Sequence, residues 1–119
     1  MSTDEFNERL ARIRTRFAAA LPKKIDDAFT ALPVMSDKDA VAVETIVIVH
    51  RTLHEMCGVA PSLGFPATGK AARAAETVLR EPAKTKRTLR TDEVKTLIAE
   101  IDALRSAAQA DLQALSDQG

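Results

Sequence analysis

Aromatic side chains are scarce in this chain of 119 residues, which has no tryptophan, no tyrosine and only four phenylalanines. Proteins that bind single-stranded nucleic acid stack the bases on such rings, so the composition argues against that class. An excess of one charge is missing too, because 17 lysines and arginines balance 17 aspartates and glutamates. A formal net charge of zero gives no overall attraction to nucleic acid or to an anionic membrane. We expect neither as a partner.

The chain also has little that would place it outside the cytoplasm. A single cysteine excludes an internal disulfide, and the first residues lack the basic and apolar regions of a secretion signal. No apolar run is long enough to cross a bilayer. Glycine-rich loops that bind nucleotide phosphates are absent, so we expect neither ATP binding nor kinase activity. The length predicts one domain over residues 1–119, and we expect it in the cytoplasm.

The N-terminal third has apolar residues at helical spacing, at Phe6, Leu10, Ile13 and Phe17. Pro22 has no amide hydrogen and its ring clashes with the preceding turn, so we expect an interruption of the helix there. A second helical stretch is then predicted from Pro22, with Pro33 ending it.

The middle of the chain predicts two more helices. Ser36 and Asp39 resemble a capping box ahead of a central helix, whose apolar residues run from Val41 to Met56. An alanine-rich helix follows from Ala67 to Arg80, and Pro82 is expected to end it. The β-branched residues of the central segment also suit a strand, but no partner strand is evident elsewhere.

The last quarter predicts a connector and a long helix. Residues 83–90 are basic with little apolar content, which is typical of a solvated connector. Thr91-Asp92-Glu93 then caps a helix whose apolar stripe extends from Val94 to Leu115. Together these segments predict an all-α, up-and-down four-helix bundle with the N-terminal helix interrupted near Pro22.

His54 begins the most informative run of the chain, because Gly58 and Gly64 follow it by four and ten residues. A glycine one helical turn from an exposed histidine leaves the imidazole open to a second protein. Such access suits a histidine that hands a group to a partner.

The run from His54 resembles the signature of histidine-containing phosphotransfer domains, small bundles that relay phosphoryl groups in two-component signalling. In that family the second residue after the active histidine is apolar, the third is often lysine, the fourth is glycine and the sixth is small. The ninth and tenth residues are leucine and glycine. The residues at those places here are Met56, Cys57, Gly58, Ala60, Leu63 and Gly64. The resemblance continues through residues 65–75 to Glu76, where the family commonly has a glutamate.

The resemblance implies a phosphorelay intermediate and not an enzyme. His54 would accept a phosphoryl group from a phospho-aspartyl receiver domain and pass it to another. The implied partners are response-regulator receiver domains and a hybrid histidine kinase, with the chain itself a monomer. No cofactor is implied, and Mg²⁺ is expected only in the partner receiver domain. Glu76 would accept a hydrogen bond from Nδ1 of the imidazole and leave Nε2 to attack, as the matching residue does in some members.

A docking surface is expected around the phosphorylated histidine, formed by His50, Arg51, Cys57, Gly58, Pro61, Lys70 and Arg73. Cys57 stands where the family often has lysine, so Arg51, Lys70 or Arg73 would have to supply a nearby positive charge. Pro61 removes a helical hydrogen bond and is expected to bend or end the central helix.

Three alternatives accompany this interpretation. His50 lies one turn before His54, but the glycine spacing does not fit if the motif is read from it. His50, His54 and Cys57 could present three zinc ligands, yet a fourth ligand is missing from the pattern, and we expect no metal. The chain could instead be a non-catalytic assembly or adaptor module that uses the C-terminal helix, Val94 to Leu115, as an interaction seam.

Overall fold

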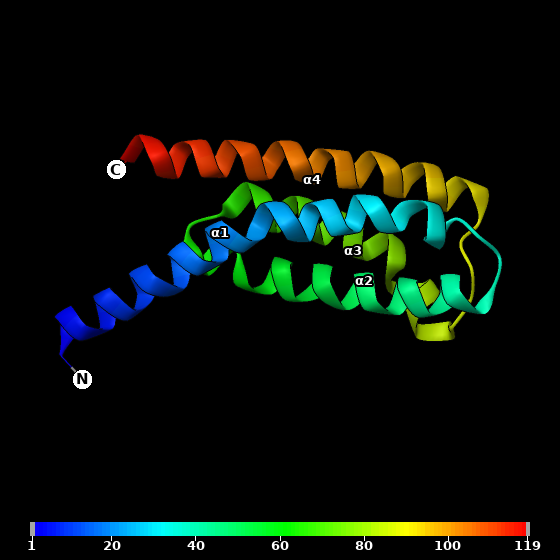
Figure 1. The fold of residues 1–119 in the computed structure, drawn as a ribbon, viewed down its shortest axis with the longest axis horizontal. Helices are drawn as coiled ribbons and strands as arrows, with labels where there is room; N and C mark the ends of the chain where they lie inside the picture. Colours follow the sequence, from blue (N-terminus) through cyan, green and yellow to red (C-terminus); the bar gives the residue numbers. More distant parts are fainter. Residues whose placement is uncertain (1, 119) are drawn as a thin grey trace.

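The computed structural model describes residues 2–118, which form four helices in an up-and-down bundle (Figure 1). The elements in chain order are α1 (Thr3–Met35), α2 (Ala40–Val59), the short 3₁₀ turn η1 (Pro61–Leu63), α3 (Pro66–Thr85) and α4 (Thr91–Gln118). No strand occurs in this part of the chain, so the all-α four-helix prediction is confirmed. None of these helices is both long and apolar enough to span a bilayer.

The predicted interruption at Pro22 is wrong, because α1 is one helix of 33 residues with Pro22 inside it. A proline in a helix interior costs about 3 kcal/mol. Leu21 and Ile25 flank it and are almost completely buried, and burying a large aliphatic side chain contributes roughly 1.5–3 kcal/mol. Core packing therefore offsets the proline. Pro33 does not end the helix either, since α1 continues to Met35.

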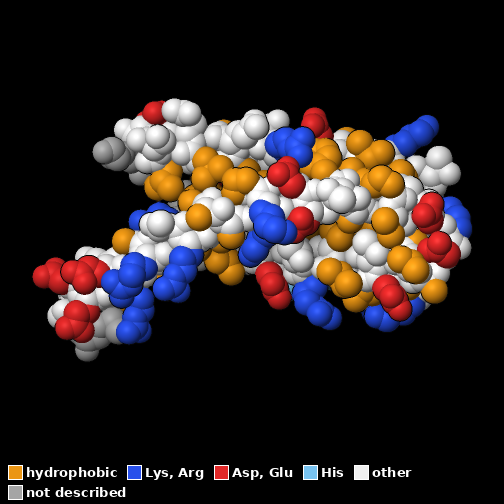
Figure 2. Space-filling model, viewed as in Figure 1, with side chains coloured by type: hydrophobic (Ala, Val, Ile, Leu, Met, Phe, Trp, Pro, Cys, Tyr) orange, Lys and Arg blue, Asp and Glu red, His pale blue; other side chains and the backbone are white. Residues whose placement is uncertain are grey.

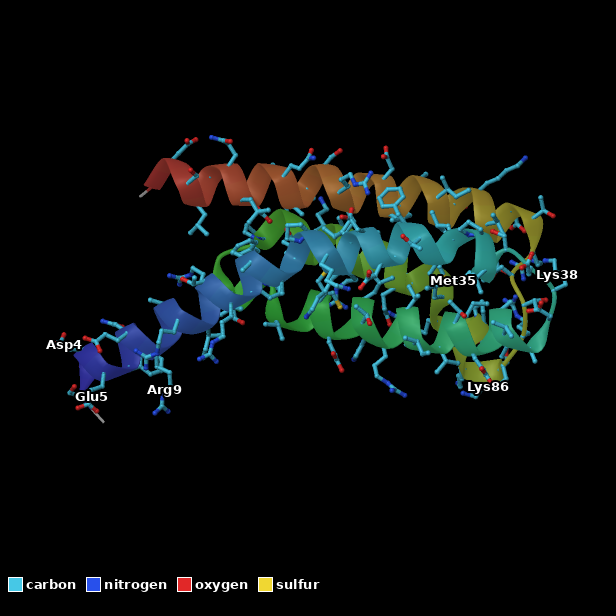
Figure 3. The ribbon with its side chains drawn as sticks, in the orientation of Figure 1. Asp4, Glu5, Arg9, Met35, Lys38 and Lys86 are labelled. Atoms are coloured by element: carbon cyan, nitrogen blue, oxygen red, sulfur yellow. The ribbon has the colours of Figure 1, made fainter. Side chains whose placement is uncertain are left out.

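The N-terminal part of α1 extends beyond the other helices and runs at an angle to them (Figure 1). Phe6 and Ile13 are 56% and 42% exposed there, so these two residues of the predicted apolar stripe do not enter the core, whereas Leu10 and Phe17 pack against it. Acidic side chains lie at the tip of this extension and basic ones along it (Figure 2). Asp4, Glu5 and Arg9 are among them (Figure 3). The bundle is built from the rest of α1 with α2, α3 and α4.

The helix ends differ from the predicted caps. Ser36 is the C-cap of α1 and takes no part in a capping box. Asp39 alone caps α2, because its side chain accepts a hydrogen bond from the backbone nitrogen of Ala42 at 2.9 Å. Lys38 donates a hydrogen bond to the backbone carbonyl of Leu89, which joins the two loops at the far end of the bundle (Figure 3).

The third helix does not end at Pro82, which is buried inside α3. The helix continues to Thr85 and ends where Lys86 adopts a positive φ of 55°. The connector to α4 is therefore shorter than predicted, and it is not wholly solvated because Leu89 is 1% exposed. At the start of α4, Glu93 accepts from the backbone nitrogen of Arg90 and from the Arg87 guanidinium. The hydrogen bond from Arg87 is the main cause that lowers the pKa of Glu93 to about 2.

The start of α3 is held by a residue of another helix. Phe65 is the N-cap and provides no side-chain hydrogen bond. The carboxylate of Asp111, on α4, instead accepts from the backbone nitrogen of Thr68 at 2.7 Å and from its hydroxyl at 2.8 Å. Asp111 is 8% exposed, so this capping bond is shielded from water. It fixes α3 against α4.

Small residues let α3 lie close to α2 and η1. Ala72 and Ala75 are completely buried on α3. A Cβ atom at Gly69 would lie 2.6 Å from Cγ of Pro61, a distance that real Cβ atoms do not show. Glycine at this position is therefore required for the observed spacing of the two helices near the turn that connects them. The spacing matters because the histidines of α2 face α3.

Candidate functional site

A buried carboxylate on α3 lies between the two histidines of α2. Glu76 is 2% exposed, and its Oε1 is 2.9 Å from Nε2 of His50 and 3.5 Å from Nδ1 of His54. The histidines are one helical turn apart, and their rings stack with centroids 6.1 Å apart and planes at 18°. Glu76 therefore makes a hydrogen bond with His50 and a longer, electrostatic contact with His54.

Arg80 holds the same carboxylate from one turn further along α3. Its Nη2 donates to Oε2 of Glu76 at 2.7 Å and its Nε donates to Oε1 at 3.3 Å. These hydrogen bonds are the largest cause that lowers the pKa of Glu76; burial opposes the shift and the bond with His50 adds to it. Glu76 is consequently ionised at neutral pH, although it is buried.

The two histidines differ in their access to a partner. The side chain of His54 is 69% exposed, whereas that of His50 is 24% exposed. Because Nδ1 of His54 faces the carboxylate, Nε2 on the opposite side of the ring is turned away from it. An imidazole in this arrangement can keep a proton on Nδ1 and use the lone pair of Nε2 as a nucleophile.

The surface next to His54 is open. Gly58 is exposed, and a Cβ atom there would meet nothing within 4 Å. The other residues expected to form a docking surface include four that are exposed, namely Arg51, Pro61, Lys70 and Arg73. The expected end of the central helix at Pro61 is confirmed, because α2 stops at Val59 and Pro61 begins η1. His54 therefore lies about one and a half turns before the end of α2.

Cys57 must be removed from the expected docking surface. Its side chain is 5% exposed, and its Sγ donates to the backbone carbonyl of His54 at 3.2 Å. Cys57 follows Leu53 by four residues on the buried side of α2, so a small apolar thiol turns inward there. Within residues 2–118 no three His, Cys, Asp or Glu side chains form a group that could hold a metal ion.

Two features of the site escaped the sequence analysis. Arg80 is the cation bonded to the carboxylate, and its spacing of four residues from Glu76 was the available signal. The expectation that Arg51, Lys70 or Arg73 supplies positive charge near the phosphorylated histidine stays a prediction. The hydrogen bond from His50 to Glu76 was also missed, because His50 was placed only at the edge of the docking surface. A single sequence does not say which of two histidines reaches a carboxylate on another helix.

The fold and the site define an all-α four-helix bundle with an exposed imidazole backed by a buried, ionised carboxylate. No protein-family model matches the chain. Searches of curated proteins and of solved structures returned no significant match either.

Proposed function

We propose that the chain is a phosphorelay intermediate of the histidine-containing phosphotransfer type, with His54 as the residue that carries the phosphoryl group. One observation supports this function above the others: the exposed ring of His54 has Nδ1 3.5 Å from an ionised carboxylate. The spacing of Gly58 and Gly64 after His54 is the second support. In this proposal the chain acts in the cytoplasm as a phosphate carrier with no ATP site of its own.

The chemistry follows from the two ring nitrogens. The lone pair on Nε2 of His54 forms a bond to phosphorus as the bond from phosphorus to the receiver's aspartyl oxygen breaks. The aspartate leaves as a carboxylate with the bonding electrons, and the imidazole, which keeps its Nδ1 proton, becomes positively charged. Glu76 stabilises that charge across the short gap. Onward transfer to a second receiver is the same step in reverse.

Little further machinery is needed in this chain. The transition state of phosphoryl transfer is loose, so positioning and charge contribute most of the catalysis. The receiver brings the aspartate and its Mg²⁺. The exposed Arg51, Lys70 and Arg73 suit an acidic receiver pocket, and Gly58 leaves room for it to approach the ring. The donors and acceptors in this proposal are response-regulator receiver domains, including one of a hybrid histidine kinase, and the chain works as a monomer.

The assembly alternative is less well supported. An interaction seam on α4 would need an apolar stripe that is free to meet a partner, yet Leu97, Ile101 and Leu104 are fully buried in the protein's own core. Val94, Leu112 and Leu115 are half-buried and pack against the same core, and Ile98 is 46% exposed. Ile98 and the exposed parts of three half-buried side chains offer too little area for a stable interface.

The experiment incubates the protein with a panel of phosphorylated receiver domains and measures acid-labile phosphate on it, with His54→Gln, His50→Gln and Gly58→Gln alongside. We expect label on the wild type and on His50→Gln and none on His54→Gln. Gly58→Gln should remain folded, because position 58 is exposed and a Cβ atom there meets nothing within 4 Å, but should lose transfer by obstructing the receiver. Absence of label from every receiver, with the protein folded, would contradict the proposed function.

A further inference from the structure

The oxygen that faces His54 is already engaged by other donors. Oε1 of Glu76 accepts from Nε2 of His50 at 2.9 Å and from Nε of Arg80 at 3.3 Å. His54, at 3.5 Å, is the most distant of the three groups around that oxygen. It is also the most exposed, so its contact is the most screened by water. The carboxylate is thus held by groups other than the ring on which it would act.

His50 lies where it can control the distance of 3.5 Å between Oε1 of Glu76 and Nδ1 of His54. It is 24% exposed, which shields its bond to Glu76, and its ring lies almost parallel to that of His54. Because an ionised carboxylate only accepts, a neutral His50 must carry its proton on Nε2 to make the bond. A rotation of the carboxylate toward His54 would lengthen this bond and weaken the contacts with Arg80. The arrangement opposes such a rotation in the resting state.

We propose that His50 is a positioning residue, which holds the Glu76 carboxylate at a distance from His54 so that a full hydrogen bond from Nδ1 forms only as phosphoryl transfer makes the ring positive. This inference rests on the proposed function. Holding the carboxylate at this distance makes its interaction with His54 stronger in the transition state than before transfer. An interaction that is equally strong before and during transfer does not speed the chemical step. A neutral imidazole attracts the carboxylate weakly, and a cationic one attracts it strongly.

Two substitutions separate this role from packing. His50→Leu keeps a side chain of similar bulk but removes the donor, whereas His50→Gln keeps an amide N–H that can reach the carboxylate. Far-UV circular dichroism and an amide NMR spectrum establish that both variants keep the fold. The probe is phosphoramidate, a small phosphoryl donor that needs no receiver domain. The appearance of N-phosphohistidine on residue 54 is followed by ³¹P NMR.

We expect His50→Leu to slow labelling of His54 by about tenfold and His50→Gln to change it by less than about twofold, within the range of coupled side chains. In a Glu76→Ala background, His50→Leu should have no further effect, because His50 acts through Glu76. Additive losses would overturn the proposal, and so would equal rates for His50→Leu and the wild type.

Long-range ¹⁵N–¹H NMR of the unphosphorylated protein gives a readout that a structural role would not change. We expect the proton of neutral His50 on Nε2, and a shift of the His54 Nδ1–H signal in His50→Leu toward that of a stronger hydrogen bond. A His50 proton on Nδ1, or an unmoved His54 signal, would overturn the inference. These measurements use no receiver domain, so they test the role of His50 separately from the proposed function. Failure of transfer from every receiver would contradict the proposed function, whereas a His50 proton on Nδ1 or an unmoved His54 signal would contradict only the role of His50.

Discussion

Two carboxylates buried in the bundle illustrate different uses of the same group. Asp111 is 8% exposed, and one oxygen accepts both of its hydrogen bonds, from the nitrogen and the hydroxyl of Thr68. Glu76 is 2% exposed and divides its contacts among Arg80, His50 and His54. Both are held by the protein, as buried carboxylates must be.

Asp111 and Glu76 differ in the contacts that they make beyond those that hold the fold together. All the contacts described for Asp111 belong to the α3–α4 packing, so its bonds stabilise the fold. Glu76 has one contact, at 3.5 Å, with a ring that is mostly in solvent. Both carboxylates are buried, so burial does not distinguish them; the contact with an exposed imidazole does, and the proposed function depends on that contact. Four experiments test whether the two carboxylates differ in this way.

Glu76→Ala should have the largest effect. It removes the group that stabilises the charged imidazole in the proposed function, and we expect phosphotransfer to His54 to fall by about a hundredfold, as for other lost electrostatic contacts to a transition state. Helicity should be unchanged by circular dichroism. A wild-type rate of transfer from a phosphorylated receiver would remove Glu76 from the mechanism.

Asp111→Ala should have the opposite pattern. The nitrogen and hydroxyl of Thr68 lose their partner and α3 loses its cap, which should lower the free energy of unfolding by about 2 kcal/mol. Urea denaturation measures this loss. Transfer by the fraction that remains folded should match the wild type, and a specific loss of transfer would show that the two carboxylates are not as distinct as their contacts indicate.

Arg80→Met should have an intermediate effect, a loss of transfer of about tenfold, because the strongest hydrogen bond to Glu76 disappears. Arg80→Lys is the matched control. Lysine keeps the charge but cannot make the two parallel bonds, so its rate should fall between those of Arg80→Met and the wild type. Equal losses in Arg80→Met and Arg80→Lys would assign the effect to the paired hydrogen bonds alone, and a wild-type rate in Arg80→Met would show that Arg80 has no part in holding the carboxylate.

The smallest of the four effects should be a change of unfolding free energy with pH. The pKa of Glu76 is lowered in the folded protein from an ordinary value of 4.5, mainly by Arg80, so the unfolded chain binds a proton more readily. The resulting stability is fully present above about pH 4.5 and is lost as the pH falls through the folded value. Wild type and Glu76→Gln should therefore differ most in unfolding free energy near neutral pH and converge in acid; a gap that is constant with pH would contradict the shift.

The number and order of the helices could be predicted from the sequence, because each helix has its own apolar residues at helical spacing. It misjudged Pro22, Pro33 and Pro82, which lie inside helices, although it predicted the end of α2 before Pro61 correctly. At Pro22, burial of Leu21 and Ile25 outweighs the local preference against proline. The sequence placed His54 and Glu76 in the candidate site, which the structure brings within contact distance. It could not reveal that His50 is the nearer histidine, because that depends on side-chain orientation between two helices.

Gly69 affects the distance between the residues of the candidate site, although it lies outside that site. The α2–α3 hairpin closes at Pro61, where a single added methyl group would be 2.6 Å from the proline ring. Helices transmit such a displacement along their length, since tightly packed side chains cannot absorb it locally. The distance between Glu76 and His54 thus depends partly on Gly69, which contacts neither residue. A chain that keeps the site must therefore also keep a glycine where α3 approaches Pro61.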